Sequence, residues 1–249
     1  MTGEEKELMH RVEELSSRSL DRGVYTQTRF LTEGEIAFIS SLKLPLAPCF
    51  EGGFSEAERC VAVFGSEEDL YYSWDNTIVL LQICQPDPKF AKKLTHRDFL
   101  GAILNLGIER DLIGDILVHE NTGYVFCLRQ IAPYLTENLK RVGSSTVSLQ
   151  ILNTLPEDVS VQTVAEEVVS ASPRLDAVVS AVFHISRSEG KNLVEREKVS
   201  VKGRLVSDPG RALIPGERVS VRGYGRFYFD GETGETRSGR SRIAVRRFI

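Results

Sequence analysis

The sequence predicts an α+β protein of several domains, and three observations point to this fold class. The chain of 249 residues is long enough for two or three small domains. Apolar residues at helical spacing near the N-terminus give way to strand-like runs further along. The hydrophobic fraction of 41% argues against disorder, and no apolar run approaches the roughly 18 residues of a membrane-spanning helix. We expect domains at residues 1–74, 75–155 and 172–249.

The N-terminal region, residues 1–74, is expected to begin with two helices. The first helix has an apolar stripe at Leu8, Val12, Leu15 and Leu20. The second opens at Thr32, where Glu35 completes a capping box, and is expected to extend to Leu42. A strand is predicted over residues 60–64.

Residues 75–155 show a cleaner pattern. We predict a strand at 77–84, a turn at 86–88, a helix from Thr95 to Gly107, strands at 115–119 and 124–129, a helix at 132–142 and a strand at 146–152. The order βαββαβ is that of the split plait found in ferredoxin-like and RRM-like domains. In RRM domains, aromatic residues on the third strand stack on bases. Tyr124 and Phe126 share one face of that strand, and both base stacking and core packing fit them.

The charge of the chain is divided unevenly. The formal net charge is −4, but residues 174–249 contain 16 basic and 9 acidic side chains, whereas residues 1–173 contain 15 and 26. A basic segment of this kind favours a polyanionic partner, because cations that neutralise phosphates release condensed counterions. The alternative is a basic domain that docks on an acidic protein surface.

The basic segment predicts two short helices on a small twisted sheet. Ser172 followed by Pro173 is expected to open the first helix, and Ser186 with Glu189 forms a capping box for the second. Arg187 and Lys191 are four residues apart, so they share one helix face and could hold neighbouring phosphates. Strands are predicted at 199–203 and 218–222, with a turn at 207–210 between them.

At these residues the segment resembles the alpha-L RNA-binding motif, which is named for small-subunit ribosomal protein S-four. Residues 174–176, 186–188, 199–203 and 215–221 follow the order and spacing of that motif. Where this chain has Gly190, the motif usually has a residue such as alanine, so the second helix is expected to lose up to about 1 kcal/mol of stability.

The resemblance extends over nearly the whole chain. Residues 52–59, 95–102 and 107–115 look like the YlmH family of RNA-binding proteins. The resemblance implies a plait-like RNA-binding domain in the middle and an alpha-L domain at the C-terminus. It also implies association with the bacterial ribosome, in particular with large-subunit complexes that carry stalled peptidyl-tRNA.

The expected function is therefore non-enzymatic binding of structured RNA, either ribosomal or transfer RNA, through the C-terminal domain. The candidate RNA-binding residues are Arg174, Ser186, Arg187, Ser188, Lys191, Asn192, Lys202, Arg204 and Arg222. Replacing Arg187 and Lys191 together by glutamate is expected to abolish binding and to leave the fold intact. The alternatives are a protein-interaction module and an accessory factor for RNA modification.

No catalytic or metal-binding pattern supports an enzyme. The string His96-Arg97-Asp98 imitates a kinase loop, but the required asparagine spacing and a glycine-rich nucleotide loop are missing. Gly203-Arg-Leu205 resembles the start of a pseudouridine synthase motif, yet Val206 stands where the catalytic aspartate belongs. The four histidines have no ligand spacing, so we expect neither a metal nor a cofactor.

The remaining expectations concern the setting of the protein. The N-terminal residues fit neither a secretory signal nor an organelle transit peptide, which favours a cytoplasmic protein without a membrane partner. Cys49, Cys60, Cys84 and Cys127 form no Cys-x-x-Cys pair and are expected to be buried free thiols. A monomer is expected.

Overall fold

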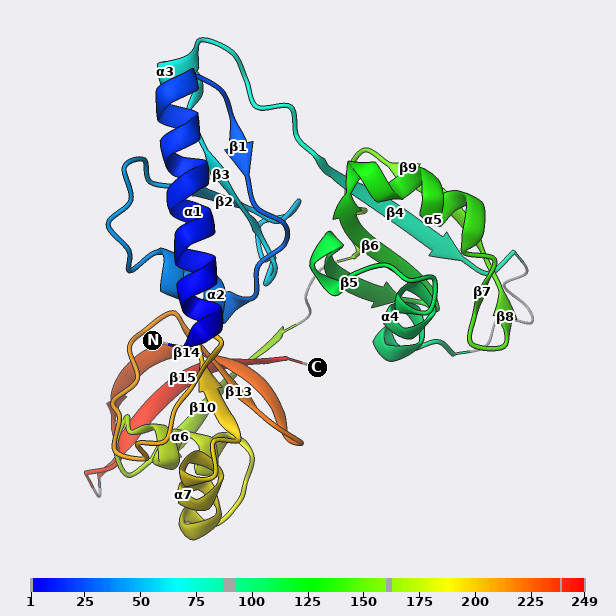
Figure 1. Cartoon of the computed structure of the whole chain (residues 1–249). Coiled ribbons are helices and arrows are strands. Elements are labelled where there is room, and N and C mark those ends of the chain that lie inside the picture. The colour runs from blue at the N-terminus through cyan, green and yellow to red at the C-terminus, as the bar shows by residue number, and fades with distance from the viewer. Residues whose placement is uncertain (1, 87–92, 160–162, 238, 249) are drawn as a thin grey trace. The chain divides into compact units, whose positions relative to one another are not determined.

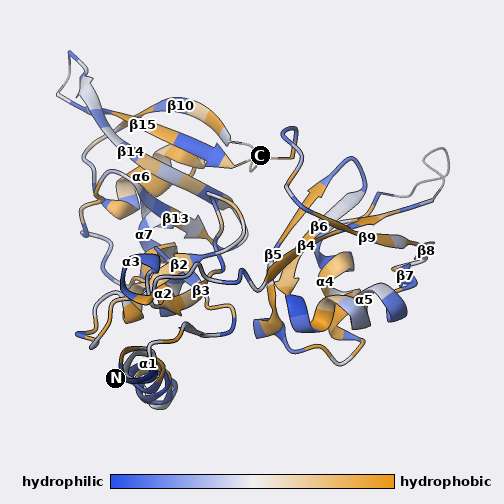
Figure 2. Cartoon of the chain, turned by 90° about the horizontal axis from the view of Figure 1, so that it is seen from above, coloured by the Kyte–Doolittle hydropathy of each residue, from blue (hydrophilic) through white to orange (hydrophobic). Residues whose placement is uncertain are grey.

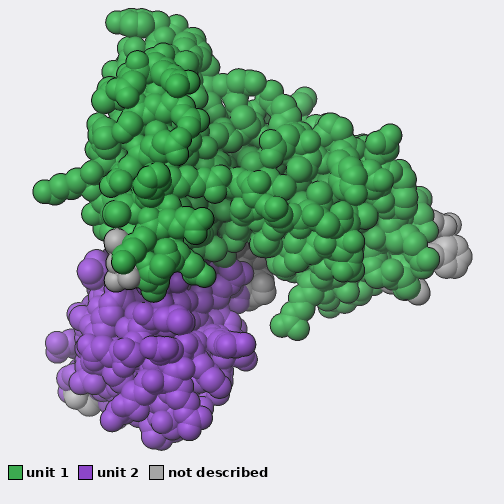
Figure 3. Space-filling view, viewed as in Figure 1, with its two compact units in different colours: residues 1–160 green, residues 161–249 purple. Residues whose placement is uncertain are grey.

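The computed structural model describes residues 2–86, 93–159, 163–237 and 239–248. The chain forms two compact units, residues 1–160 and 161–249 (Figure 3). Both units combine helices with antiparallel sheets, so the predicted α+β class is confirmed. The second unit begins ahead of residue 172, because strand β10 (Thr163–Ser170) pairs along its whole length with β15 (Ser241–Phe248).

The N-terminal part of the first unit is a small sheet with helices. Its elements are α1 (Gly3–Arg22), β1 (Thr26–Gln27), α2 (Glu33–Ile39), β2 (Cys49–Glu51), β3 (Val61–Phe64) and α3 (Glu67–Leu70). The strands pair in the order β1-β3-β2. The predicted capping box of Thr32 and Glu35 is confirmed. However, α2 ends at Ile39 and not at Leu42, because the amides of Ser41 and Leu42 bond to the third preceding carbonyl and tighten the chain into a turn.

The rest of the first unit is the predicted plait (Figure 1). Its elements are β4 (Ile78–Cys84), α4 (His96–Leu104), β5 (Ile113–His119), β6 (Thr122–Leu128), α5 (Ala132–Asn138) and β9 (Ser148–Leu152). The four strands pair antiparallel in the order β5-β6-β4-β9, which places the first strand in the centre. Figure 2 shows that β4 and β6 are largely hydrophobic, as expected for central strands.

Several details of the plait differ from prediction, and part of one predicted turn is not described. The helix predicted to reach Gly107 ends at Leu104. The helix predicted at 132–142 ends at Asn138, because β7 (Arg141–Val142) and β8 (Ser145–Thr146) form a hairpin whose turn needs the positive φ of Gly143. The turn between β5 and β6 has only two residues, Glu120 and Asn121, both with positive φ. The predicted turn at 86–88 lies beyond Pro86 outside the described residues.

Both faces of the plait sheet are covered within the first unit. On the helix side, Phe99 of α4 lies so close to Gly123 that an added Cβ would meet its ring at 2.6 Å. On the other side, Phe54 stacks on Phe126 with their ring centroids 4.9 Å apart. Gly53 also contacts Phe126, since its positive φ brings the backbone against the ring. The N-terminal part and the plait therefore share one core.

The second unit carries two helices on a six-stranded antiparallel sheet. The helices are α6 (Leu175–Val182) and α7 (Arg187–Glu195), and the further strands are β11 (Val199–Val201), β12 (Arg204–Leu205), β13 (Glu217–Val221) and β14 (Gly225–Glu235). The strand order is β10-β15-β14-β13-β11-β12. Val179, Leu193, Phe227 and Phe229 belong to its buried core. The predicted pair of helices on a sheet is present, and the sheet is larger than the sequence indicated.

The prediction that Ser172 caps α6 is wrong. The N-cap is Arg174, whose side chain makes no capping hydrogen bond. The backbone of the segment 209–213 satisfies the start of the helix instead. The amide of Leu175 donates to the carbonyl of Arg211 at 2.8 Å, and that of Asp176 donates to the carbonyl of Pro209 at 3.2 Å. A tertiary contact therefore replaces the side-chain cap.

Gly190 has a packing role that helix propensity alone does not reveal. A Cβ at this position of α7 would lie 2.1 Å from the hydroxyl oxygen of Ser180 and 2.7 Å from the carbonyl oxygen of Asp176, both on α6. The glycine therefore permits the close approach of the two helices. Gly101 of α4 is the opposite case, because a Cβ there would meet nothing within 4 Å.

These two glycines give a matched prediction. Gly190→Ala is expected to lower the free energy of unfolding of the second unit by about 1 to 3 kcal/mol, since α6 and α7 must move apart. Gly101→Ala is expected to raise that of the first unit by up to about 1 kcal/mol, since alanine favours the helix without a clash. Chemical denaturation of both variants measures the two effects. A stabilised Gly190→Ala variant would contradict the packing role.

The sequence predicts that the cysteines are buried free thiols and that no segment spans a membrane. All four cysteines are free thiols; Cys60 and Cys127 are buried as expected, whereas Cys49 is exposed and Cys84 is half-buried. Burial raises the pKa of the Cys60 thiol to about 11 and that of Cys127 to about 12, so both stay protonated near neutral pH. Within the described parts of the chain, every helix is too short or too polar to cross a membrane.

Candidate nucleic-acid interface

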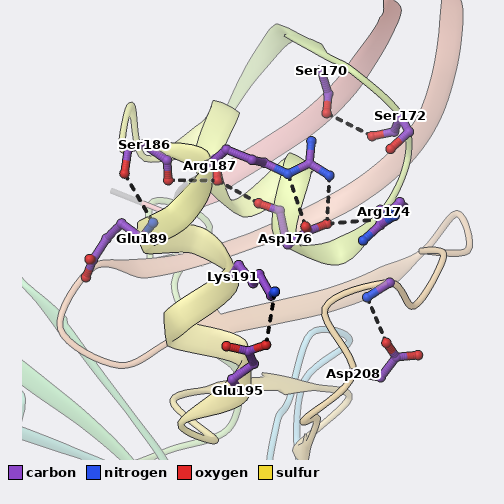
Figure 4. Close-up of polar contacts among 12 residues, drawn as sticks. Ser170, Ser172, Arg174, Asp176, Ser186, Arg187, Glu189, Lys191, Glu195 and Asp208 are labelled. Atoms are coloured by element: carbon purple, nitrogen blue, oxygen red, sulfur yellow. Dashed lines mark hydrogen bonds and ion pairs between the residues drawn. The ribbon is translucent and has the colours of Figure 1, made fainter.

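The joint between α6 and α7 is held by an acidic side chain between two arginines. The carboxylate of Asp176 is only 4% exposed, and Arg187 donates to it twice, from Nε at 3.0 Å and from Nη2 at 3.2 Å (Figure 4). Arg174 Nε lies 3.4 Å from the same carboxylate. A bidentate contact with a buried carboxylate fixes the guanidinium strongly. Arg187 therefore holds the two helices together, although its side chain is partly exposed.

Most of the other polar residues predicted on α7 have partners on their own helix. Lys191 Nζ lies 3.5 Å from the carboxylate of Glu195, one turn further on (Figure 4). Ser186 is the N-cap, as predicted, and its hydroxyl oxygen accepts the amide of Glu189 at 3.1 Å. The Ser188 hydroxyl lies 2.9 Å from that of Ser186. Asn192 is exposed. The cations of α7 are thus balanced by neighbouring carboxylates.

Some of the remaining cations of the second unit have carboxylate partners, and others have none among the described residues. Ion pairs engage Arg211 with Glu217, Arg242 with Glu167, Arg246 with Asp230 and Arg247 with Glu166. By contrast, Lys198, Lys202, Arg204 and Arg222 are exposed, and none of their side chains has a hydrogen bond or an ion pair to a residue that the structure describes. We call these four residues the cationic rim. Their charges are available to a ligand.

The backbone brings the cationic rim together around β11. Lys198 precedes this strand, and its carbonyl accepts the amide of Arg222 at 2.9 Å. Lys202 follows the strand, where its positive φ and that of Gly203 form the two-residue turn into β12. Arg204 is the first residue of β12. The rim therefore occupies both ends of a strand of three residues, which spans roughly 10 Å.

An open concavity lies beside two residues of this rim, Lys198 and Arg222. Its volume is about 600 Å³, and Ser200, Ser220 and Tyr224 are among the residues that line it, together with Lys198 and Arg222. Tyr224 is 42% exposed, and its ring centroid lies 5.8 Å from that of Phe183. Hydroxyl groups, an accessible aromatic ring and unpaired cations are the groups that contact phosphate, sugar and base in RNA. One acidic side chain, Glu197, also lines the concavity.

The structure thus divides the predicted site residues into two sets. Lys202, Arg204 and Arg222 belong to the cationic rim. Arg174, Ser186, Arg187, Ser188, Lys191 and Asn192 lie on or before α7, where most of them have protein partners. Sequence reasoning missed Lys198 and Tyr224. The position of Lys198 next to the predicted strand 199–203 is the one signal that could have indicated it.

The sheet face of the plait does not offer the base-stacking surface of an RRM. Phe126 is 2% exposed beneath Phe54, and Tyr124 is also buried. The hydroxyl of Tyr124 accepts a hydrogen bond from Gln82 Nε2 at 3.3 Å. Of the two interpretations that the sequence allowed, the structure supports core packing.

The groups that resembled catalytic motifs have structural roles. Asp98 accepts the amide and the hydroxyl of Thr95, both at 2.7 Å, and these hydrogen bonds hold its pKa below the usual value. In the turn that follows Val206, where the pseudouridine synthase motif would have its catalytic aspartate, Asp208 accepts the amide of Gly210 at 2.8 Å. Among the described residues, no three His, Cys, Asp or Glu side chains are grouped to hold a metal ion.

Three comparisons relate this geometry to known proteins. Residues 73–155 match the family model described as "Putative RNA-binding domain in YlmH". The chain is 28% identical over 225 residues to the ribosome-associated protein quality control protein P2 of Bacillus subtilis (strain 168), a match that covers 88% of this chain and 86% of that protein. The structure of the cell division protein YlmH from Streptococcus pneumoniae is similar at a TM-score of 0.49 and 27% identity, covering 61% of this chain and 93% of that one. The family match coincides with the plait.

Proposed function

Residues 73–155 match the YlmH RNA-binding domain family. From this premise we propose that the chain is a ribosome-associated protein that binds structured RNA without catalysis. The relative from Bacillus subtilis, which is named for ribosome-associated quality control, supports the setting. The proposed RNA is ribosomal or transfer RNA, on large-subunit complexes that carry stalled peptidyl-tRNA. The second unit acts in this proposal as an alpha-L-type RNA-binding domain.

The observation that carries the proposal is the cationic rim. A basic side chain that pairs with a carboxylate attracts phosphate only weakly, because the carboxylate neutralises its charge. Lys198, Lys202, Arg204 and Arg222 have no such partner among the described residues, so their full charge acts on a phosphate. Four free cations at the ends of one short strand, two of which line an open concavity, match the closely spaced phosphates of a folded RNA. Double-stranded RNA hides its base edges in a deep groove, so a compact surface of this kind recognises backbone shape.

The salt dependence of RNA affinity tests this proposal. The association constant for a short RNA duplex, measured by fluorescence anisotropy, is expected to fall with salt with a log–log slope at least as steep as about −3 to −4, because the four contacts of the cationic rim contribute about 0.9 each. Co-sedimentation with separated ribosomal subunits is expected to place the chain on the large subunit. A chain that binds neither RNA nor subunits contradicts the proposal. Binding to an acidic protein in place of RNA would favour the interaction-module alternative.

A further inference from the structure

The face of the plait sheet that binds RNA in RRM domains is buried in this chain, so RNA must contact the plait elsewhere. On its third strand, Phe126 is packed under Phe54 and Tyr124 is also buried, so bases cannot stack on either ring without a rearrangement of the fold. The ligand surface must therefore lie on other parts of the plait. This step rests on the proposed function, since it takes RNA as the ligand.

The helix side of the plait contains a concavity of about 560 Å³. One wall is a stripe of α4 that includes Arg97, Gly101 and Asn105, which are four residues apart and share one helix face. The opposite wall is the segment that follows α5, where Lys140 and Arg141 lead into the β7–β8 hairpin. Three cations from two separate elements thus surround one hollow.

Among the described residues, no acidic side chain pairs with these cations. Arg97 has no side-chain hydrogen bond or ion pair within the described residues. Lys140 Nζ donates to the carbonyl of Thr136 and Arg141 Nη2 to that of Ser144, both at 3.3 Å. These contacts with neutral oxygens orient the two side chains and leave their positive charge uncompensated. The opposing charge in the lining is Asp98, whose carboxylate is held at the start of α4 by Thr95.

Polar amides and open space complete this surface. Asn105 and Asn138 both line the concavity and are exposed. Asn138 Nδ2 donates to the carbonyl of Tyr134 at 2.8 Å, which leaves its amide oxygen able to accept a bond from a ribose hydroxyl. At Gly101 an added Cβ would meet no atom within 4 Å, so a ligand can approach the helix backbone closely. Cations with amides at a shallow, open hollow suit a sugar-phosphate backbone.

We propose that the concavity formed by α4 and residues 138–143 binds the sugar-phosphate backbone of RNA. The plait then contacts RNA through its helix side, and the ligand class is phosphodiester with ribose. This surface is separate from the cationic rim, which belongs to the other unit. RNA contact therefore involves both units of the chain.

Gly101 offers a direct test in the full-length chain. Gly101→Glu adds a carboxylate to the wall of the concavity, and Gly101→Gln adds a neutral side chain of the same size there. Both fit, because the position is open, and both favour the helix. The affinity for a short RNA duplex is expected to fall about fivefold to tenfold in Gly101→Glu relative to Gly101→Gln, which corresponds to about one lost phosphate contact. Thermal unfolding of both variants serves as the folding control.

A second variant tests the cations themselves. Replacing Arg97, Lys140 and Arg141 together by glutamine is expected to flatten the salt dependence of duplex binding by about two to three units of log–log slope. Equal affinity of the two Gly101 variants, together with an unchanged slope in the triple variant, overturns this inference while RNA binding by the chain still stands. A wild-type chain that does not bind RNA overturns the proposed function as well.

Discussion

Replacing Lys202 and Arg204 together by glutamate is expected to weaken the binding of duplex RNA by on the order of 100-fold at about 0.1 M salt. At that salt concentration each lost phosphate contact costs slightly less than tenfold, and the new carboxylates also repel the backbone. Both side chains are exposed and have no ion-pair partner among the described residues, so the fold should be unaffected. Fluorescence anisotropy with a short RNA duplex measures the loss.

The second unit provides a control with the same change in net charge. Arg237 and Arg240 are exposed at the hairpin between β14 and β15, whereas the cationic rim adjoins the other end of the eleven-residue strand β14. Replacing both by glutamate is expected to change the affinity far less. If the two double variants lose equal affinity, the overall charge of the unit governs binding and the rim is not a defined site.

Arg187→Ala is expected to lower the free energy of unfolding of the second unit by about 2 to 3 kcal/mol. The substitution removes both hydrogen bonds to a carboxylate that stays buried, with only the longer contact from Arg174 remaining. Lys191→Ala is the control, because the exposed pair with Glu195 contributes about 0.5 kcal/mol or less. Chemical denaturation of both variants measures the difference; equal stabilities would show that the Arg187 contact is dispensable.

The ion pair between Arg187 and Asp176 determines which substitutions can test the RNA-binding face without unfolding it. The sequence suggested that Arg187 and Lys191 could both be replaced by glutamate without harm to the fold. A glutamate at position 187 would instead face the buried Asp176 with a like charge, so loss of RNA binding could follow from loss of structure. Substitutions at Lys202 and Arg204 avoid this ambiguity.

The parts of the fold that were predicted correctly depend on local signals. The capping boxes at Thr32 and Thr95 act within a few residues, and the structure confirms both. The apolar stripe of α1 is confirmed at Leu8, Val12 and Leu15, which pack in the N-terminal core, whereas Leu20 is exposed. The start of α6 was predicted wrongly, because the amides of this helix bond to the segment 209–211, far away in the sequence. Long strands such as β14 were missed for a related reason, since exposed polar residues and two register shifts interrupt their pattern.

In the candidate site, too, local sequence signals were reliable and tertiary contacts could not be predicted. Lys202, Arg204 and Arg222 stand out in the sequence because each adjoins a turn or a predicted strand, and all three have free charges in the structure. Arg187 is equally basic, yet its partner Asp176 lies on another helix, and no local pattern reveals that pairing. Formal charge identifies which side chains are cationic, but only the tertiary contacts show which of them can still attract a ligand.

The pairing of β10 with β15 also affects the order of events during synthesis. The second unit places its first strand beside its last, and β15 lies between β10 and β14 in the sheet. A nascent chain that has not yet released β15 from the exit tunnel leaves β10 without a neighbour and β14 with an open edge, whereas the first unit has all its strands. The first unit can therefore fold while translation continues, and the second must wait for its final strand.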